Sequence, residues 1–272
     1  MEKKQTWILV NPQWANKEEL EYEPSKIELP STLIYKFRPD NDSTEKIFTE
    51  QSLWFSRPSA FNDPFDCNAG IGKFNPQQAR EFLITCKKIN RQEFFFFDEK
   101  AKNMIQEITY NIINKAIDEK SGILCTSRTN NNTLMWSHYA KEHSGICLEF
   151  DVGKGFLPSA PNFSPALVVE YNSHRPILNP FAPINEQLLS IIKVKSPEWM
   201  YEQEVRFVCM ENKKGEDDKG FSCKFNKNSL TKIIFGCKTT QDTIQKYKEL
   251  CTENGFKNVN FSKMKMDDNA FF

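Results

Sequence analysis

Two acidic residues two positions apart, Glu202 and Glu204, are followed at the same spacing by the basic residue Arg206. If residues 199–210 form a β-strand, the three side chains share one face and the two carboxylates lie about 7 Å apart. Like charges at that distance destabilise a fold unless a cation or a ligand hydroxyl compensates them. The pattern therefore has two interpretations: a solvated strand edge with an internal ion pair, or an acid pair that binds sugar hydroxyls and stabilises positive charge on a sugar carbon.

A second group of chemistry-bearing residues lies in segment 134–140, where Trp136, His138 and Tyr139 follow one another closely. One interpretation is a packed aromatic core with a hydrogen-bonded histidine. The other is a functional site, since polar side chains are clustered here among aromatic residues. His143 lies five residues beyond His138, so the two imidazoles do not share a helix face and no metal-binding pair is expected.

Basic side chains also occur near the start of the chain, where Lys36 and Arg38 lie on the polar side of an alternating segment. Arg38 could bind a phosphate with two parallel hydrogen bonds, or it could be an ordinary surface charge. The loop 61–66 contains Asn62 and Asp63, whose side chains could simply bind their own backbone. The common phosphate-binding glycine loops and zinc-hydrolase motifs do not occur in the sequence.

The elements that must position these residues follow from the periodicity of apolar side chains. Strands are predicted over 33–38, 53–56, 123–127, 146–152, 199–210, 232–236 and 259–266. Helices are predicted over 42–51, 76–88, 98–120, 134–142 and 240–254, with short extended or helical runs over 166–171 and 189–194. The fold class that follows is α+β, with a helical insertion at 76–120.

Length and composition favour a single domain over residues 1–272. The chain has 36 basic and 36 acidic residues, and zero net charge gives no support for general nucleic-acid binding. A mean hydropathy of −0.59, without a long apolar run, predicts a protein that is not in a membrane. The N-terminus lacks the apolar run of a signal peptide, and the eight cysteines include no CxxC pair. We therefore expect a cytoplasmic protein with reduced thiols and no metal.

Three segments taken in order resemble the bacterial family known as domain of unknown function 2971. They are 34–38 together with 53–66, then 134–150, and then 199–206. The resemblance covers roughly residues 33–240. The family name implies no activity.

The order of a basic residue on an early strand, a central aromatic segment and a late Glu-x-Glu segment is similar to that of ADP-ribosyltransferases. This similarity implies a mixed, split β-sheet core, with NAD as a substrate. Arg38 would hold the phosphate or ribose of NAD, and Tyr139 or Trp136 would stack on it. Glu204 would bind the ribose 2′-hydroxyl and stabilise the oxocarbenium-like transition state, and Glu202 or Gln203 would orient the acceptor. The further residues expected at this site are His138 as a catalytic group and Tyr35, Lys36, Ser56, Asn62, Asp63 and Arg206 as nucleotide-binding groups.

The middle of the chain differs from the arginine-modifying ADP-ribosyltransferases, because Cys125-Thr126-Ser127 stands where a Ser-Thr-Ser triplet would be. The first hypothesis is nevertheless an NAD-consuming ADP-ribosyltransferase or NAD glycohydrolase, acting as a bacterial toxin or an anti-phage effector. Its partners would be a macromolecular acceptor or a regulatory protein. Two alternatives stay open. One is a binding or sensor module in which the tryptophans and acidic residues are structural. The other is a metal-dependent nuclease or hydrolase that uses Asp63, Asp66, His138 and Glu149.

Overall fold

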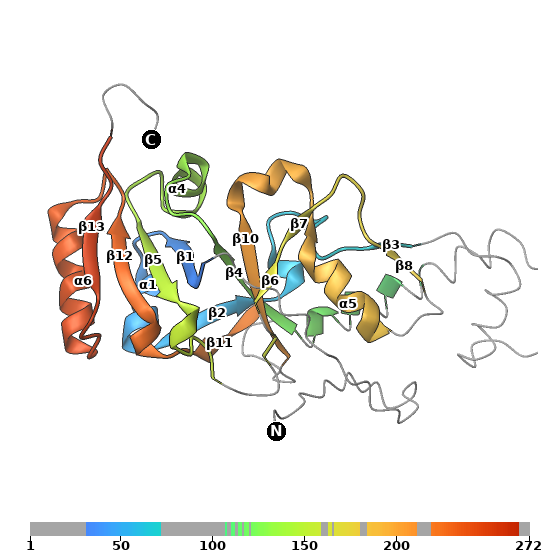
Figure 1. Cartoon of the computed structure of the whole chain (residues 1–272), viewed down its shortest axis with the longest axis horizontal. Coiled ribbons are helices and arrows are strands. Elements are labelled where there is room, and N and C mark those ends of the chain that lie inside the picture. Colours follow the sequence, from blue (N-terminus) through green and yellow to red (C-terminus); the bar gives the residue numbers. More distant parts are fainter. Residues whose placement is uncertain are drawn as a thin grey trace, which may run out of the picture.

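Short alternating segments form the strands of a mixed β-sheet in the computed structural model of the chain (Figure 1). The structure describes residues 31–71, 121–158, 163–164, 166–179, 184–210 and 219–266, and the single positions 107, 110, 111, 114, 115 and 117–119. Within these residues nine strands belong to one sheet, and two further pairs of short strands lie beside it. The fold class is α+β, as the periodicity predicts.

The strands of the main sheet alternate in sequence with helices and loops. They are β1 (Leu33–Arg38), β2 (Ser52–Ser56), β4 (Ser121–Ser127), β5 (Ile146–Asp151), β6 (Leu167–Val168), β10 (Glu204–Met210), β11 (Gly220–Lys224), β12 (Leu230–Phe235) and β13 (Asn260–Lys263). The small pairs are β3 (Gly70–Ile71) with β8 (Ile177–Leu178), and β7 (Glu170–Tyr171) with β9 (Val194–Lys195).

The helices have similarly short spans. The α-helices are α1 (Asp42–Thr49), α4 (Thr133–Tyr139), α5 (Ile184–Lys193) and α6 (Gln241–Glu253). Short 3₁₀ helices are η1 (Pro58–Ala60), η2 (Val152–Lys154), η3 (Pro197–Glu202) and η4 (Lys227–Ser229). Among the described residues, no helix combines the length and the apolar character that crossing a membrane requires.

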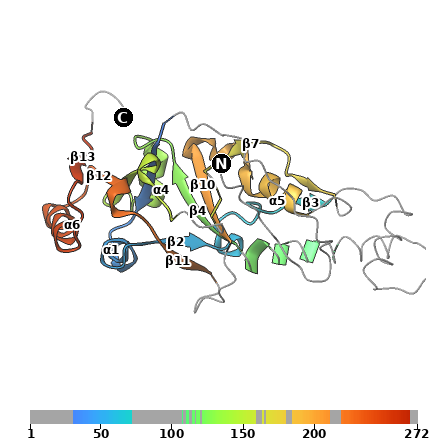
Figure 2. The same ribbon diagram turned by 60° about the horizontal axis from the view of Figure 1, so that its bottom comes forward.

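Strand β4 is the point at which the main sheet divides. Along one edge it pairs with β10 over its whole length. On the other edge it pairs with β1 at Ser127 and with β2 at Ile123, so the two partners diverge from positions four residues apart. One branch continues through β1, β5, β12 and β13, and the other through β2 and β11. Figure 2 shows β2 and β11 apart from β12 and β13. The largest apolar cluster of the described residues is shared by both branches, since it includes Ile34 of β1, Phe55 of β2 and Phe150 of β5.

The two faces of β1 are covered by different elements because its side chains alternate. Ile34 packs into the large core against α1. Phe37 points to the other face and contacts Trp136 of α4 edge-on, with ring centroids 5.2 Å apart. Helix α4 begins at Asn132, whose side chain accepts hydrogen bonds from two backbone amides of the first turn. The packing therefore places α4 over β1 and beside η3.

Most of the predicted elements occur, with boundaries displaced by a few residues. Helix α5 forms one ten-residue helix where a short extended or helical run is predicted over 189–194. The predicted helix 76–88 lies outside the described residues, and the described positions within 98–120 are helical. The prediction of a strand over 199–210 is wrong for the residues before Glu204. Residues 197–202 form η3, which Pro197 starts, and Gln203 has a left-handed backbone with φ of 45°, so the strand begins only at Glu204.

Gly236 joins the end of β12 to the turn that follows α4. Its amide donates to the carbonyl of Gly145, and its α-carbon lies against the backbone of His143. A β-carbon at Gly236 would come within 2.6 Å of the carbonyl carbon of His143 and closer still to its oxygen. Because the obstacle is backbone, no side-chain rotation can relieve the clash. This close approach holds the α4–β5 turn against the sheet.

We expect Gly236→Ala to lower the free energy of unfolding by about 2 kcal/mol, because the turn must move away from the sheet. Gly70→Ala is the matched control, since its β-carbon would meet nothing nearer than 3.9 Å and its φ is not in the left-handed region. Urea denaturation of the two variants measures the difference. Equal stability of both variants would show that the close approach at Gly236 carries no strain.

Candidate functional site

The guanidinium of Arg206 is fully buried on β10 and uses all five of its N–H donors. Its Nε donates to Glu204 at 2.8 Å, and Nη2 donates to Asp66 at 2.7 Å and to Glu204 at 2.9 Å. Its Nη1 donates to the carbonyl of Ile192 at 2.6 Å and to the sulfur of Cys67 at 3.2 Å. Arg206 is therefore a structural centre to which the loop before β3, the end of α5 and its own strand are all bound.

Lys195, on β9, adds a second buried cation beside Arg206. Its Nζ lies 2.6 Å from Glu202, 3.1 Å from Glu204 and 3.4 Å from Asp66, and it stands over the ring of Trp199. The side chain of Lys195 is only 7% exposed. Three carboxylates thus share two cations in a group that we name the acid–base cluster. Its members are Asp66, Lys195, Glu202, Glu204 and Arg206.

The turn between η3 and β10 explains how Glu202 joins the cluster without lying on the strand. Gln203 adopts the left-handed conformation, and its carbonyl accepts the amide of Arg128 at 3.0 Å. The hydroxyl of Ser127 donates to the carbonyl of Glu202 at 2.6 Å. These contacts with the end of β4 bring the carboxylates of Glu202 and Glu204 onto the same lysine.

The loop 61–66 reaches the cluster through a tryptophan. Trp199 of η3 donates from its indole nitrogen to Asp63 Oδ2 at 2.8 Å, and Asp63 Oδ1 accepts the amide of Phe65 at 2.9 Å. The backbone of Asp63 also accepts the amide of Asp66. Asp63 is therefore a tie that orients Asp66 toward Arg206.

Electrostatics separates the two glutamates. Burial alone would raise the pKa of Glu204, but the charges of Arg206 and Lys195 lower it to about 2. The pKa of Glu202 is raised by burial and by the neighbouring charge of Glu204, against the pull of Lys195. Burial tends to lower the pKa of Lys195, but the three nearby carboxylates together have the larger effect and raise it above its ordinary value. Glu202 is thus the acid of this pair that takes up a proton first.

Some sequence-predicted site residues meet at the cluster. Glu202, Glu204 and Arg206 do so directly, and Asp63 does so through Trp199. Tyr139 joins them from α4, since its hydroxyl donates to Glu202 Oε1 at 2.6 Å. An aromatic residue and an acid that are far apart in the sequence are therefore in contact.

Other predicted residues lie elsewhere. Arg38 donates to the hydroxyls of Ser43 and Thr44 at the first turn of α1, and it projects from the face of β1 opposite Trp136. Trp136 is buried and donates to the carbonyl of Asn130. Within the described part of the chain, no hydrogen bond or ion pair joins Arg38 or Trp136 to the cluster.

The remaining members of the predicted set are also spread over the fold. His138 is exposed, with its ring centroid 6.2 Å from that of Tyr201. Asn62 is exposed and Ser56 is a half-buried strand residue that pairs with Ile123. Tyr35 is half-buried against the core under α4.

Lys36 is half-buried near the division of the sheet. Its Nζ donates to the carbonyl of Cys125 at 2.7 Å, between the positions at which β1 and β2 join β4. Burial lowers the pKa of its amino group.

Sequence reasoning missed the two cluster members that come from other segments, Lys195 and, in its ion-pairing role, Asp66. Lys195 follows the apolar helix α5 and is preceded by Val194. The alternation of Lys193, Val194 and Lys195 directly after an apolar run is the available signal. This signal does not identify the ion-pair partners of Lys195, because Asp66 is 129 positions away along the chain.

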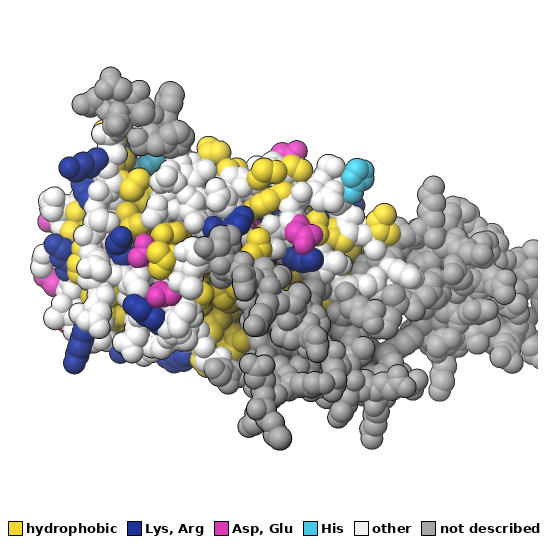
Figure 3. Space-filling view, in the orientation of Figure 1, with side chains coloured by type: hydrophobic (Ala, Val, Ile, Leu, Met, Phe, Trp, Pro, Cys, Tyr) yellow, Lys and Arg dark blue, Asp and Glu magenta, His cyan; other side chains and the backbone are white. Residues whose placement is uncertain are grey.

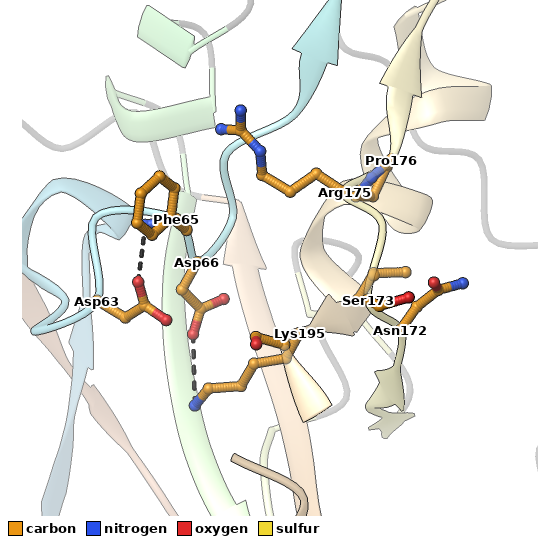
Figure 4. Close-up of a pocket in the computed structure, with 10 residues that line it drawn as sticks. Asp63, Phe65, Asp66, Asn172, Ser173, Arg175, Pro176 and Lys195 are labelled. Carbon is orange, nitrogen blue, oxygen red and sulfur yellow. Dashed lines mark hydrogen bonds and ion pairs between the residues drawn. The ribbon is translucent and has the colours of Figure 1, made fainter. Parts of the chain in front are cut away.

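A hollow of about 230 Å³ lies beside the cluster (Figure 4). It opens between the loop before β3 and the segments around β7, β8 and β9. Its lining residues are Asp63, Phe65, Asp66, Asn172, Ser173, Arg175, Pro176, Val194, Lys195 and Ser196. Neither Glu202 nor Glu204 lines it, so the hollow is bordered by only one side of the cluster.

One atom of the cluster is unsatisfied. Asp66 Oδ2 is bound by Arg206 and Lys195, whereas Asp66 Oδ1 is buried and has no hydrogen-bond partner among the described residues. In Figure 4 the carboxylate oxygen that takes no part in the dashed contact with Lys195 points toward the hollow. An unpaired buried acceptor costs about 1–3 kcal/mol, so this atom is the place where a ligand donor would gain most.

Comparisons with known proteins cover part of this region. Residues 135–207 match the family model described as "Protein of unknown function (DUF2971)", which supports the family resemblance for the segment from α4 into β10. That segment contains every member of the acid–base cluster except Asp66. No curated protein and no solved structure gave a match.

The distribution of charged side chains bears on the nucleic-acid and metal alternatives. On the face drawn in Figure 3, basic and acidic side chains are interspersed rather than gathered by sign. Among the described residues, no three His, Cys, Asp or Glu side chains are grouped as a metal site would require. Glu149, for example, accepts the hydroxyl of Thr231 instead of meeting Asp63 or His138.

We expect Glu204→Gln to lower the free energy of unfolding by about 3 kcal/mol, because both buried cations lose one of their charged, hydrogen-bonded partners. Glu170→Gln is the matched control. Glu170 also pairs with a lysine, at 2.7 Å, but it is 61% exposed and its loss should cost less than about 1 kcal/mol. Urea denaturation at pH 7 measures both. A cost for Glu204→Gln as small as that of the control would show that the cluster does not stabilise the fold.

The pH dependence of unfolding in Glu204→Gln and in Glu202→Gln provides a second test. Because the folded-state pKa of Glu204, about 2, lies below its ordinary value of 4.5, its stabilisation is complete above pH 4.5 and is lost as the pH falls toward 2. The difference between wild type and Glu204→Gln should therefore shrink as the pH falls from about 5 to about 2. Glu202 has a raised pKa, so wild type should instead gain stability relative to Glu202→Gln as the pH falls from about 7 toward 4.5. Parallel curves for the two variants would contradict the assignment.

Proposed function

We propose that this protein is a binding module that holds a small polar molecule in the hollow beside the acid–base cluster. The observation that carries the proposal is the contrast within the cluster. Every carboxylate oxygen of Glu202 and Glu204 has a partner, whereas Asp66, which lines the hollow, keeps one oxygen without a partner among the described residues. The paired groups hold Asp66 in place behind the hollow, and its unpaired oxygen is the proposed point of recognition.

The burial of Glu204 supports a structural role for it. An acid that stabilises charge on a sugar carbon must come into contact with that carbon. The carboxylate of Glu204 is only 2% exposed and is bound by both Arg206 and Lys195. Replacing these contacts by a substrate would take one buried carboxylate partner from each of the two cations. Glu204 is therefore better suited to holding Arg206 and Lys195 in place than to catalysis.

The composition of the hollow suits a small polar ligand. Ligand sites combine apolar contact area with a few fixed polar groups. Here Phe65 and Pro176 provide apolar area, Asn172 and Ser173 provide amide and hydroxyl groups, and Arg175 provides a charge. We expect the module to act in the cytoplasm, where its thiols would stay reduced.

If the hollow binds the ligand, Ser173→Trp should abolish binding, since an indole would fill the space. The matched control is Ser262→Trp on β13, an exposed position that does not line the hollow and lies at the other end of the sheet (Figure 1). Ligand-detected NMR with a panel of polar metabolites identifies compounds that bind wild type. Compounds lost with Ser173→Trp and kept with Ser262→Trp support the proposal. A panel that yields no such compound would overturn it.

The second candidate function is an NAD-consuming ADP-ribosyltransferase or NAD glycohydrolase, as a toxin or anti-phage effector with a macromolecular acceptor or water. The observation that favours it is the contact between Tyr139 and Glu202, which joins an aromatic residue of α4 to an acid of η3. Tyr35 and Tyr201 pack against the same apolar cluster as Tyr139 and are likewise only partly buried. In this candidate the aromatic groups stack on the dinucleotide and Glu202 replaces Glu204 as the acid in contact with the ribose.

This candidate predicts nicotinamide release when the purified protein is incubated with NAD, with and without protein or nucleic-acid acceptors. Glu202→Gln should then reduce turnover by about a hundredfold or more. Glu170→Gln, an exposed glutamate outside the cluster, should leave turnover unchanged. Circular dichroism verifies that each variant is folded. Absence of nicotinamide release by wild type under every acceptor condition would remove this candidate and leave the binding module standing.

A further inference from the structure

We propose that the ligand of the hollow is a small zwitterion, with a primary ammonium group that binds Asp66 and an anionic group that binds Arg175. This inference rests on the proposed binding function and adds the chemical class of the ligand. Its basis is a pair of oppositely charged groups that line the hollow from different loops and that have, among the described residues, an unpaired oxygen on Asp66 and no ion pair at Arg175. Asp66 comes from the loop before β3, and Arg175 comes from the segment between β7 and β8 (Figure 4).

The charge count of the cluster favours a cationic donor over a neutral one. Three carboxylates are bound directly to two cations, so the bonded group carries one excess negative charge. Five of the six carboxylate oxygens have partners: both oxygens of Glu202, both of Glu204, and Asp66 Oδ2. The remaining oxygen, Oδ1, is buried and belongs to Asp66, which is one of the residues that line the hollow. An ammonium group placed there satisfies the acceptor and balances the charge at the same time.

The position of Asp66 limits the group that can bind it. Its side chain is 3% exposed, so the donor must be compact and must enter from the hollow. The neighbouring ring of Phe65 is 63% exposed, and it is the lining group that can move aside at least cost. A primary ammonium meets these conditions, since it is a point charge with three hydrogen-bond donors.

Arg175 supplies the complementary charge. Its side chain is exposed and its guanidinium stands 5.4 Å from the ring centre of Phe65, without an ion pair to any described residue. A guanidinium held over a ring keeps its in-plane N–H donors available for a carboxylate or a phosphate. An anion on the ligand would therefore bind Arg175 while the ammonium binds Asp66.

Two sources share this chemistry: α-amino acids, whose anion is a carboxylate, and amino-alcohol phosphates. Full-length protein is titrated by calorimetry with the twenty protein amino acids and with O-phosphoethanolamine. Each compound that binds is compared with its analogue lacking the ammonium and its analogue lacking the anion. We expect one of the two classes to bind, and each single-charge analogue to bind at least ten times more weakly. Which class binds distinguishes carboxylate from phosphate.

The residue roles are tested with Arg175→Gln, which changes an exposed side chain and should leave the fold intact. We expect it to weaken the zwitterion at least tenfold and to remove the preference for the zwitterion over the analogue lacking the anion. Lys248→Gln is the matched control, because Lys248 is also a cation over a phenyl ring, that of Phe261, away from the hollow. Asp66→Asn should remove the preference for the ammonium, and where this variant does not fold the Arg175 result decides.

The outcomes separate this inference from the function on which it rests. Hollow binders from the metabolite panel that lack an ammonium or an anion, or a zwitterion whose affinity is the same in Arg175→Gln and wild type, would overturn the ligand class and leave the binding function standing. No binder at all that is sensitive to Ser173→Trp would overturn both. Tight binding of the zwitterion that is lost in Arg175→Gln and kept in Lys248→Gln would support both.

Discussion

The burial of one guanidinium is the constraint on which this structure depends. Arg206 has no exposed surface, and every one of its donors has a partner. A buried cation is tolerated only when its partners are held in place, because desolvation costs more than any single ion pair returns. The loop before β3, the end of α5 and the start of β10 must therefore stay where they are. Their positions define the wall of the hollow.

The same constraint explains why a single carboxylate oxygen is left over. Arg206 commits two of its donors to Ile192 and Cys67, so its remaining donors and the three of Lys195 must serve three carboxylates. Tyr139, which is not a member of the cluster, donates its hydroxyl hydrogen to the second oxygen of Glu202. Asp66 lies furthest toward the hollow and shares its bound oxygen between both cations. Because Glu204 Oε2 and Asp66 Oδ2 are each bound by both cations, Asp66 Oδ1 is the oxygen left without a donor within the described part of the chain.

Sequence patterns predicted the elements better than the site. The strands at 33–38 and 146–152 and the helix at 240–254 follow local periodicity, and the structure has them within a few residues. The strand predicted over 199–210 failed at its start because alternating carboxylates imitate a strand face. The left-handed backbone of Gln203 depends on contacts with the end of β4, which no local pattern contains. The structure brings Glu202 and Glu204 together through a lysine from β9, which only the tertiary fold supplies.

The two candidate functions use opposite sides of one hydrogen-bonded group. Asp66 borders the hollow, Lys195 binds both Asp66 and Glu202, and Glu202 accepts the hydroxyl of Tyr139 under α4. A ligand in the hollow would touch the first of these residues, and a dinucleotide under α4 would touch the last. Because Lys195 connects the two sides and is itself nearly buried, changes to the cluster affect both. A substitution outside the cluster, such as one at Ser173 in the lining of the hollow, changes the hollow without changing the contact between Glu202 and Tyr139. Residues at the edge of the acid–base cluster, rather than its members, therefore distinguish the two candidate functions.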